Sequence, residues 1–344
     1  MKEMFMFLNK KVSVGASVFL FSVMVAAADS SFVVDAQAEN TNAGVQAYLE
    51  GRYDDAEQFF LSHTKTTESK NESLMFLGRI AIMRGDTELA VNYVEQALAI
   101  GPNSAEEVKI SGDVYCNQAQ GTSIFTALKL AKKCAAQYET ALQIDANNIE
   151  ALAAAARFYL SAPSIAGGST KKGTEYLQRL QQLSPEDADT YKIYSLEQEG
   201  KTDAALKLAD KLSGKTFRSA INQYEVAHYL RDKKEFAKAK RLFESVSNTP
   251  IAVKTKWHIH DSLLQLGEIA IMENDFDKGI ELIEQYQSRN RNPKDPHYFW
   301  AFWSLAKAYK LVGNTEKYAL LVNKIKSEDY QKDKAFSKEF EANI

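Results

Sequence analysis

The segment Trp257-His258-Ile259-His260-Asp261 holds the densest group of residues that could bind a metal ion. Imidazole and carboxylate groups are common zinc ligands. Histidines two residues apart point to different faces of a helix, so they could share one ion only if this segment were extended. We favour an interpretation in which the segment is the polar start of a helix, with Asp261 in its first turn. The sequence therefore predicts no metal site and no cofactor.

The segment Gly167-Gly168-Ser169-Thr170-Lys171 has residue types found in phosphate-binding loops. It lacks the spacing of such a loop, and no strand pattern precedes it, so we interpret it as a loop between two helices. The many carboxylates, such as Asp54 and Asp55, lie at expected helix starts, where they favour the helix dipole. No set of residues combines a nucleophile, an acid and a base, and we predict that the protein is not an enzyme.

Cys116 and Cys134 form an even pair, which in an oxidising compartment is usually bridged or packed inert. If Gly121 is the turn of a helical hairpin, the two residues lie about 12 Å apart along its axis. The Cα atoms of a disulfide are at most about 7 Å apart. A continuous second helix therefore predicts unpaired cysteines, and a disulfide is expected only if the intervening residues form a loop.

The composition indicates a globular, helical chain. Hydrophobic residues make up 45% and charged residues 25%, while 6 Pro and 16 Gly are too few to punctuate an all-β chain of 344 residues. The net charge is −3 and the pI is near 6.1, so there is no basic excess of the kind that nucleic-acid binding requires. We therefore expect no nucleic-acid partner.

The first 38 residues have the anatomy of a signal peptide. A start containing Lys2, Lys10 and Lys11 leads into an apolar stretch, residues 12–28. Cleavage could follow Ala28 or Ala38, and we favour Ala38 because repeats begin just after it. An uncleaved anchor is the alternative, although the apolar stretch is short for a membrane span. The sequence predicts export, with no membrane insertion after cleavage.

A period of 34 residues organises the rest of the chain. Gly44, Gly51 and Ala56 recur as Gly78, Gly85 and Ala90. Copies of the repeat begin near Gln37, Asn71, Ala105, Ile149, Glu186, Ala220, His260 and Phe299.

The second copy, residues 71–104, resembles the tetratricopeptide repeat (TPR) family in its small residues Gly78 and Ala90 and its Pro102. The resemblance implies an all-α, right-handed TPR solenoid of about eight helix hairpins, in which small residues at the eighth and twentieth positions let two helices pack closely. The solenoid is expected over residues 39–327. Residues 328–344 are expected to form a capping helix and tail, with aromatic side chains facing the array.

Two copies depart from the period. The third carries about ten extra residues that keep a helical spacing, which predicts one long second helix. The fourth carries extra residues at 161–169, where Pro163 and paired glycines predict an irregular loop. This combination resembles insertions in TPR proteins of the bacterial envelope, which favours a Gram-negative periplasm.

The resemblance also predicts the concave surface, because the first helix of each TPR hairpin lines it. The residues at the corresponding positions are Met75, Arg79, Lys109, Asp113, Asn117, Arg157, Tyr194, Tyr224, His228, Arg231, Glu268, Trp300, Trp303 and Lys307. This mixture of charged, aromatic and Met residues suits a protein or peptide partner. Asp113 would repel a carboxylate, so the family's clamp for a peptide C-terminus is not expected at these positions. Trp300 and Trp303 could instead pack against the terminal helix.

These observations predict a non-catalytic periplasmic TPR scaffold that binds a protein or peptide through its concave groove. The alternative is a small-molecule-binding accessory subunit of an envelope transport system, with the long third copy and the Gly-Gly loop forming a lid. Neither the identity of the partner nor the oligomeric state follows from the sequence.

Overall fold

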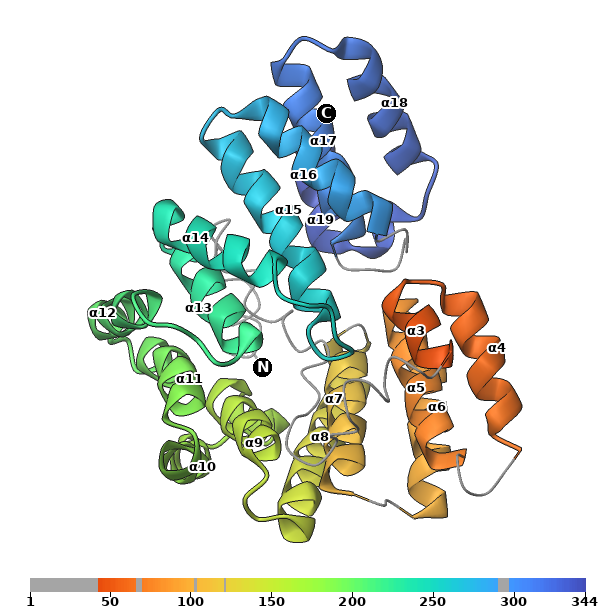
Figure 1. The fold of residues 1–344 in the computed structure, drawn as a ribbon, viewed down its shortest axis with the longest axis vertical. Helices are drawn as coiled ribbons and strands as arrows, with labels where there is room; N and C mark the ends of the chain where they lie inside the picture. The colour runs from red at the N-terminus through yellow and green to blue at the C-terminus, as the bar shows by residue number, and fades with distance from the viewer. Residues whose placement is uncertain (1–42, 66–69, 102–103, 121, 290–296) are drawn as a thin grey trace.

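The computed structural model describes residues 43–65, 70–101, 104–120, 122–289 and 297–344, which form seventeen α-helices (Figure 1). The predicted signal peptide and both cleavage positions lie outside these residues. Within the described residues, no helix is long and apolar enough to cross a membrane. The helices are α3 Ala43–Leu49, α4 Tyr53–His63, α5 Lys70–Met83, α6 Thr87–Ile100, α7 Ala105–Gln120, α8 Ile124–Ile144, α9 Ile149–Ser161, α10 Thr170–Leu183, α11 Pro185–Gln198, α12 Thr202–Ser213, α13 Ala220–Asp232, α14 Phe236–Ser247, α15 Lys256–Met272, α16 Phe276–Arg289, α17 Tyr298–Leu311, α18 Thr315–Lys326 and α19 Lys334–Asn343.

Successive helices from α3 to α18 pack as hairpins, and each hairpin packs on the next. The starts predicted near Asn71, Ala105, Ile149, Glu186, Ala220 and Phe299 agree with the first helix of a hairpin to within one residue. The repeat frame that starts near His260 agrees with the packing of Gly267 on Gly279. The prediction of a helix start with Asp261 in its first turn is wrong, because α15 begins one turn earlier than His260, at Lys256. Asp261 therefore lies in the second turn of α15.

The 34-residue recurrence of glycine reflects the turn inside each hairpin. Gly51 and Gly85 have φ angles of 78° and 68°, the left-handed region that favours glycine. Lys234 and Asn274 occupy the same turn in later hairpins, with φ angles of 64° and 65°. These turns therefore keep the left-handed conformation even where another residue replaces glycine.

Small residues allow the close packing predicted at the eighth and twentieth positions. When His260 is counted as the first position of its copy, the eighth residue is Gly267 on α15 and the twentieth is Gly279 on α16. These two glycines face each other. A Cβ atom on Gly267 would lie 2.6 Å from Cγ1 of Ile283 and 3.1 Å from the carbonyl oxygen of Gly279. The two helix backbones thus meet at a distance that only glycine permits.

Both predicted insertions are confirmed. The helix α8 runs unbroken for 21 residues, and its first turn carries Phe125, which is 84% exposed. The helix α9 extends through Ser161, and residues 162–169 form a loop that contains only a short 3₁₀ helix, η1, at Ser164–Ala166. This loop lies against α8.

Cys116 and Cys134 form a disulfide, with Cα atoms 5.3 Å apart. The prediction that a continuous α8 would keep them apart is wrong. It placed the start of α8 level with the end of α7, whereas α8 begins further out, at its exposed Ile124 and Phe125. Gly112 also brings α7 close to α8, because a Cβ atom there would lie 3.2 Å from the carbonyl oxygen of Cys134.

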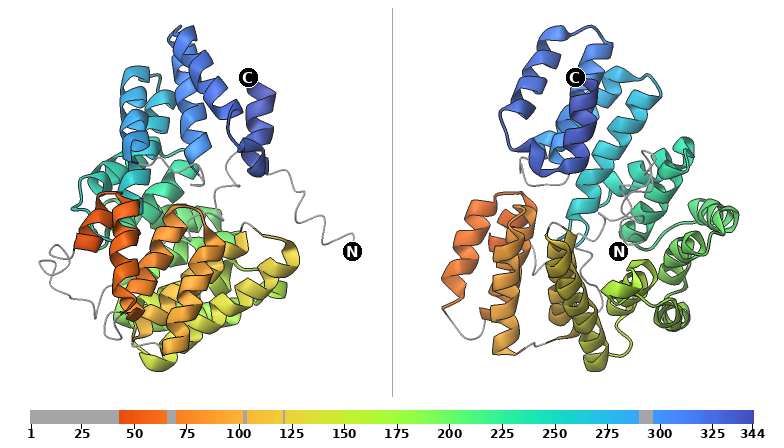
Figure 2. Two further views of the ribbon diagram at one scale, coloured as in Figure 1. Left: turned by 90° about the vertical axis from the view of Figure 1, so that its right-hand side faces the viewer. Right: turned by 180° about the vertical axis from the view of Figure 1, so that it is seen from behind.

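The solenoid curves until its first hairpin meets α15 (Figure 2). The ammonium of Lys256 donates a hydrogen bond to the carbonyl oxygen of Tyr48, 208 residues earlier in the chain. The same ammonium lies 4.9 and 4.5 Å from the ring centroids of Tyr48 and Tyr53. One hydrophobic cluster includes Val45 as well as Trp257, so this contact is part of the core.

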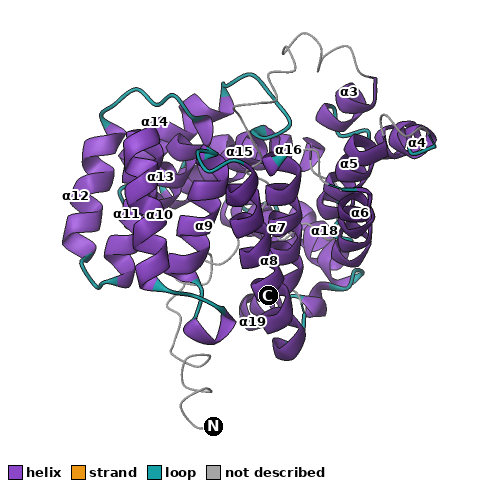
Figure 3. Ribbon diagram, turned by 90° about the horizontal axis from the view of Figure 1, so that it is seen from below, coloured by secondary structure: helices purple, strands orange, loops and turns teal. Residues whose placement is uncertain are grey.

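The described part of the chain contains helices and loops and no strand (Figure 3), which confirms the all-α prediction. The last helix, α19, packs on α17. Its Phe336 and Phe340 are fully buried, at the centre of a cluster that also holds Trp303 and Tyr330. The end of the array is therefore covered by its own aromatic residues.

Candidate functional site: a cavity on the concave face

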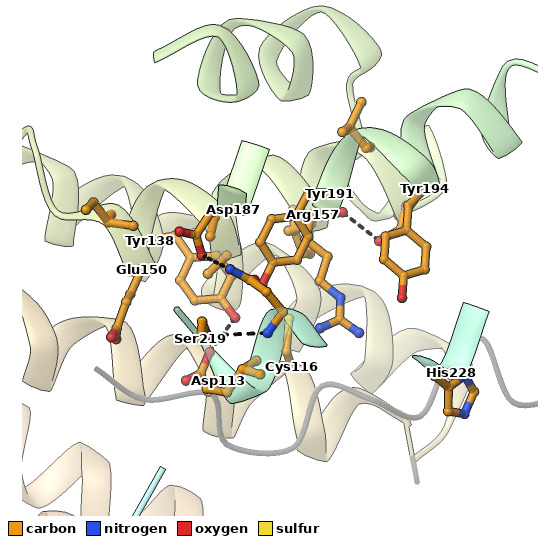
Figure 4. Close-up of a pocket in the computed structure, with 18 of the residues that line it drawn as sticks. Asp113, Cys116, Tyr138, Glu150, Arg157, Asp187, Tyr191, Tyr194, Ser219 and His228 are labelled. Carbon is orange, nitrogen blue, oxygen red and sulfur yellow. Dashed lines mark hydrogen bonds between the residues drawn. The ribbon is translucent and has the colours of Figure 1, made fainter. Parts of the chain in front are cut away.

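A cavity of about 1780 Å³ lies between the first helices of four successive hairpins, α7, α9, α11 and α13 (Figure 4). The beginning of α8, the loop at 162–169 and the segments before α13 and α15 complete its wall. Five of the predicted groove residues line it, namely Lys109, Asp113, Arg157, Tyr194 and His228.

The other predicted residues do not line this cavity. Met75, Arg79, Asn117 and Tyr224 are buried, and Arg231, Glu268 and Lys307 are half-buried. The first helices of neighbouring hairpins pack side by side, so Arg79, Tyr224, Arg231 and Glu268 contact the next hairpin. For example, Arg79 lies 3.7 Å from Glu106 on α7.

Trp300 and Trp303 lie at the C-terminal end of the array, away from the cavity lining. Trp303 is 1% exposed and packs against Phe340, while Trp300 packs against Phe336. The alternative in which these residues pack against the terminal helix is the one that the structure shows.

At one end of the cavity, a buried ion pair joins two predicted residues. The ammonium of Lys109 lies 2.8 Å from Oδ2 of Asp113, and Oδ1 of Asp113 accepts a 2.8 Å hydrogen bond from Tyr138. Lys109 is 2% and Asp113 is 9% exposed. These two charges neutralise each other, which makes their burial tolerable.

Arg157 occupies the middle of the cavity. Its Nη1 lies 3.4 Å from Oε1 of Glu225, which is only 2% exposed, and Tyr194 donates a 2.6 Å hydrogen bond to the other oxygen of Glu225. Burial lowers the pKa of Arg157, but Glu225 and the neighbouring tyrosines together outweigh this effect and raise that pKa above its ordinary value. The guanidinium therefore stays charged.

Glu150 lies two turns before Arg157 on the same face of α9 and also lines the cavity. Burial raises its pKa to about 7, against the weaker opposing effect of Lys109. Sequence reasoning missed Glu150 although it occupies the second position of the fourth copy, one of the family's groove positions. It also missed Glu225 and Tyr191, which lie at the sixth positions of their copies, where no family pattern points to the groove.

His228 lines the cavity in its neutral form. Burial lowers its pKa to about 3, with a smaller contribution from Arg231. His258 and His260 are buried in α15 with pKa values lowered to about 4 and about 3, again mainly by burial. In the part of the chain that the structure describes, no group of three or more His, Cys, Asp or Glu residues is placed to hold a metal ion.

Asp261 on α15 does not line the cavity, but it connects the first helices of three successive hairpins. Tyr224 donates a 2.5 Å hydrogen bond to its Oδ2, and Nδ1 of His297 lies 2.5 Å from its Oδ1. Burial would raise the pKa of Asp261, but His297 and Tyr224 together hold it below its ordinary value. These contacts fix the relative positions of α13, α15 and α17.

The end of the cavity near α8 is apolar. It is lined by Ile124, Ala127, Leu128 and Ala131 of α8 and by Leu160, Ala162, Pro163 and Ala166 of α9 and the following loop. A ligand in this cavity would therefore meet charged and aromatic groups along α9, α11 and α13 and a non-polar wall at α8.

No protein-family model and no curated protein matches the sequence. Among solved structures, yeast Tom70 is similar at 14% identity with a TM-score of 0.58, over 97% of this chain and 64% of that chain. A tetratricopeptide repeat protein from Parabacteroides merdae is similar at 14% identity and a TM-score of 0.45, over 77% of this chain and 95% of that chain. The human IFIT1 dimer with m7Gppp-AAAA is similar at 16% identity and a TM-score of 0.45, over 86% of this chain and 68% of that chain.

The array of hairpins and the likeness to Tom70 show that the chain has a TPR-like solenoid fold, as the sequence resemblance predicted. At this identity the likeness extends to the fold alone. This chain spans less than two thirds of the length of Tom70.

Proposed function

We propose that the protein is a non-catalytic periplasmic scaffold that binds a segment of a partner protein in the cavity on its concave face. The size of the cavity carries this proposal. Small-molecule sites usually enclose about 300–1,000 Å³, whereas this cavity encloses about 1780 Å³ and spans four hairpins. A peptide in an extended or helical conformation would fill such a volume.

Two observations support export. Residues 1–38 have the composition of a signal peptide, and Cys116 and Cys134 form a disulfide, a bond that persists in oxidising compartments. Cell fractionation followed by intact mass measurement tests the localisation. Cleavage after Ala38 is expected, and an uncleaved chain in the cytoplasm would contradict the proposal.

Site-specific photo-crosslinking tests the binding site. A photoreactive residue at Phe217, which lines the cavity, is expected to form a discrete crosslink to one partner in a periplasmic extract. The same residue at Lys207, which is exposed on α12 and is not part of the cavity wall, is the control. Equal crosslinking at both positions, or none at Phe217, would contradict the proposal.

The second candidate function is a small-molecule accessory subunit. The specific observation in its favour is the apolar wall, because α8 and the loop at 162–169 come together there as a lid would require. Native mass spectrometry of the purified protein tests this candidate. A retained ligand of defined mass would favour it over the scaffold.

A further inference from the structure

We propose that Arg157 anchors a carboxylate that is carried by an apolar chain lying in the cavity. This inference rests on the proposed function, because it names the chemistry that the partner presents to the cavity. The argument depends on the unused donors of Arg157, the hydroxyl of Tyr191 and the distribution of charge along α9.

The guanidinium of Arg157 has five N–H donors. Among the described residues it makes one hydrogen bond, the 3.4 Å contact with Glu225. Its side chain is 21% exposed and reaches into the cavity, as Figure 4 shows. One edge of the guanidinium therefore faces Glu225, and the remaining donors face the space that a ligand would occupy.

Tyr191 places a second donor beside Arg157. It is 6% exposed, lines the cavity and lies close enough to Arg157 to influence its pKa. Its hydroxyl has no hydrogen-bond partner within the described ranges. Burial raises the pKa of Tyr191 above its ordinary value, so the hydroxyl stays protonated and can donate a hydrogen bond. A planar guanidinium edge beside a hydroxyl donor is suited to a carboxylate.

The charges on α9 orient the ligand. Glu150 lies seven residues before Arg157, which is about 10 Å along the helix. Its negative form would repel a carboxylate placed at that end. In the opposite direction, the cavity is lined by Leu160, Ala162, Pro163 and Ala166 and by Ile124 and Leu128 of α8, all of which are uncharged. The carboxylate is thus expected at Arg157, with its apolar chain extending towards α8.

Two sources could supply this chemistry, a free aliphatic acid or the C-terminus of a partner polypeptide with apolar final residues. Calorimetric titration of the full exported chain distinguishes them. The first pair of probes is dodecanoate and methyl dodecanoate. The second pair is the peptide Ala-Leu-Ala-Leu with a free carboxylate and the same peptide with a C-terminal amide.

The variants are chosen so that folding does not decide the outcome. Arg157→Gln alone would leave Glu225 buried without its counter-charge, so the test variant carries Arg157→Gln together with Glu225→Gln. Tyr191→Phe removes only the hydroxyl. Lys215→Gln, which removes an exposed cation from the rim of the same cavity, is the matched control. Circular dichroism confirms that each variant is folded.

In one of the two pairs, the acid is expected to bind about tenfold or more tightly than its neutral counterpart. The double variant should lose this preference, Tyr191→Phe should reduce it, and Lys215→Gln should keep it. Equal binding of acid and neutral probe, an unchanged double variant, or no binding of either acid would overturn the inference. A crosslinked partner at Phe217 combined with any of these results would leave the proposed scaffold function standing.

Discussion

The indole ring of Trp303 on α17 packs edge-on against the phenyl ring of Phe340 on α19, with the ring centroids 5.2 Å apart. Both side chains are almost completely buried, at 1% and 0% exposure. Tyr224, at the same position of the sixth copy, is bonded to Asp261 in the next hairpin. At the end of the array the next hairpin is replaced by α19, whose phenylalanines complete the core.

Phe340→Ala is therefore expected to lower the free energy of unfolding by about 3 kcal/mol, since it removes a large side chain from a packed core. Urea denaturation followed by tryptophan fluorescence measures the change, because Trp303 reports on its own exposure. Ile344→Ala is the control, since Ile344 is 47% exposed. If both substitutions had the same small effect, α19 would not be a structural cap.

Gly267→Ala is expected to destabilise the protein by roughly 1–3 kcal/mol, because the new methyl group would overlap Ile283 and crowd the backbone of Gly279. Gly214→Ala is the matched control. Gly214 follows α12 and a Cβ atom there would meet only the carbonyl oxygen of Lys211, at 3.8 Å. Thermal unfolding of the two variants should differ clearly, and equal melting temperatures would contradict the close packing of α15 on α16.

Removing the disulfide is expected to cost about 3 kcal/mol, the usual effect of releasing a loop of this length. The two cysteines are separated by 18 residues. Unfolding of the wild type with and without dithiothreitol, compared with the Cys116→Ser, Cys134→Ser variant, measures this cost. The reductant should weaken only the wild type, and an equal effect on the variant would point to another cause.

The stability of the wild type should rise with pH above neutrality because of Lys256. Burial lowers the pKa of Lys256 from 10.5 to about 7 in the folded protein. Between these values the unfolded chain binds more protons than the folded one, so the free energy of unfolding increases as the pH rises from about 7 to about 10. His260, the neighbouring histidine, has its pKa lowered to about 3 and stays neutral throughout this range.

The Lys256→Met variant provides the comparison. Its melting temperature should respond less to pH than that of the wild type. Over this interval, the pH-dependent change in the free energy of unfolding should differ between the two proteins by on the order of a few kcal/mol. Lys215→Met, at an exposed lysine, controls for the loss of one positive charge. Parallel pH profiles for wild type and Lys256→Met would show that Lys256 is not desolvated in the folded protein.

Local sequence patterns were sufficient for the hairpins. Gly78 and Ala90 or Gly267 and Gly279 mark where two helices touch, and that information lies within one repeat. The start of α15 was predicted one turn late because the repeat frame begins at His260 and does not include the extra turn that carries Lys256 and His258. Lys256 is buried in contact with Tyr48 and Tyr53, which lie far away in the sequence.

The candidate site was predicted less completely, for a related reason. Repeat positions identify the face of a helix, but they do not give the curvature of the array. Arg157 and Tyr194 lie in the cavity, whereas Tyr224, another predicted groove residue, is bonded to Asp261 in the next hairpin. Glu225 could not be assigned from the repeat, since its role depends on a side chain two hairpins away.

The hydrogen bond between Lys256 and Tyr48 also has an evolutionary consequence. Repeat arrays commonly gain or lose units by duplication and deletion, because each unit contacts only its neighbours. An extra hairpin inserted between α4 and α15 would carry α15 away from Tyr48 and leave the ammonium of Lys256 without its aromatic surroundings. Homologous chains are therefore expected to keep a constant number of hairpins within this interval and to vary in the number of hairpins only outside it.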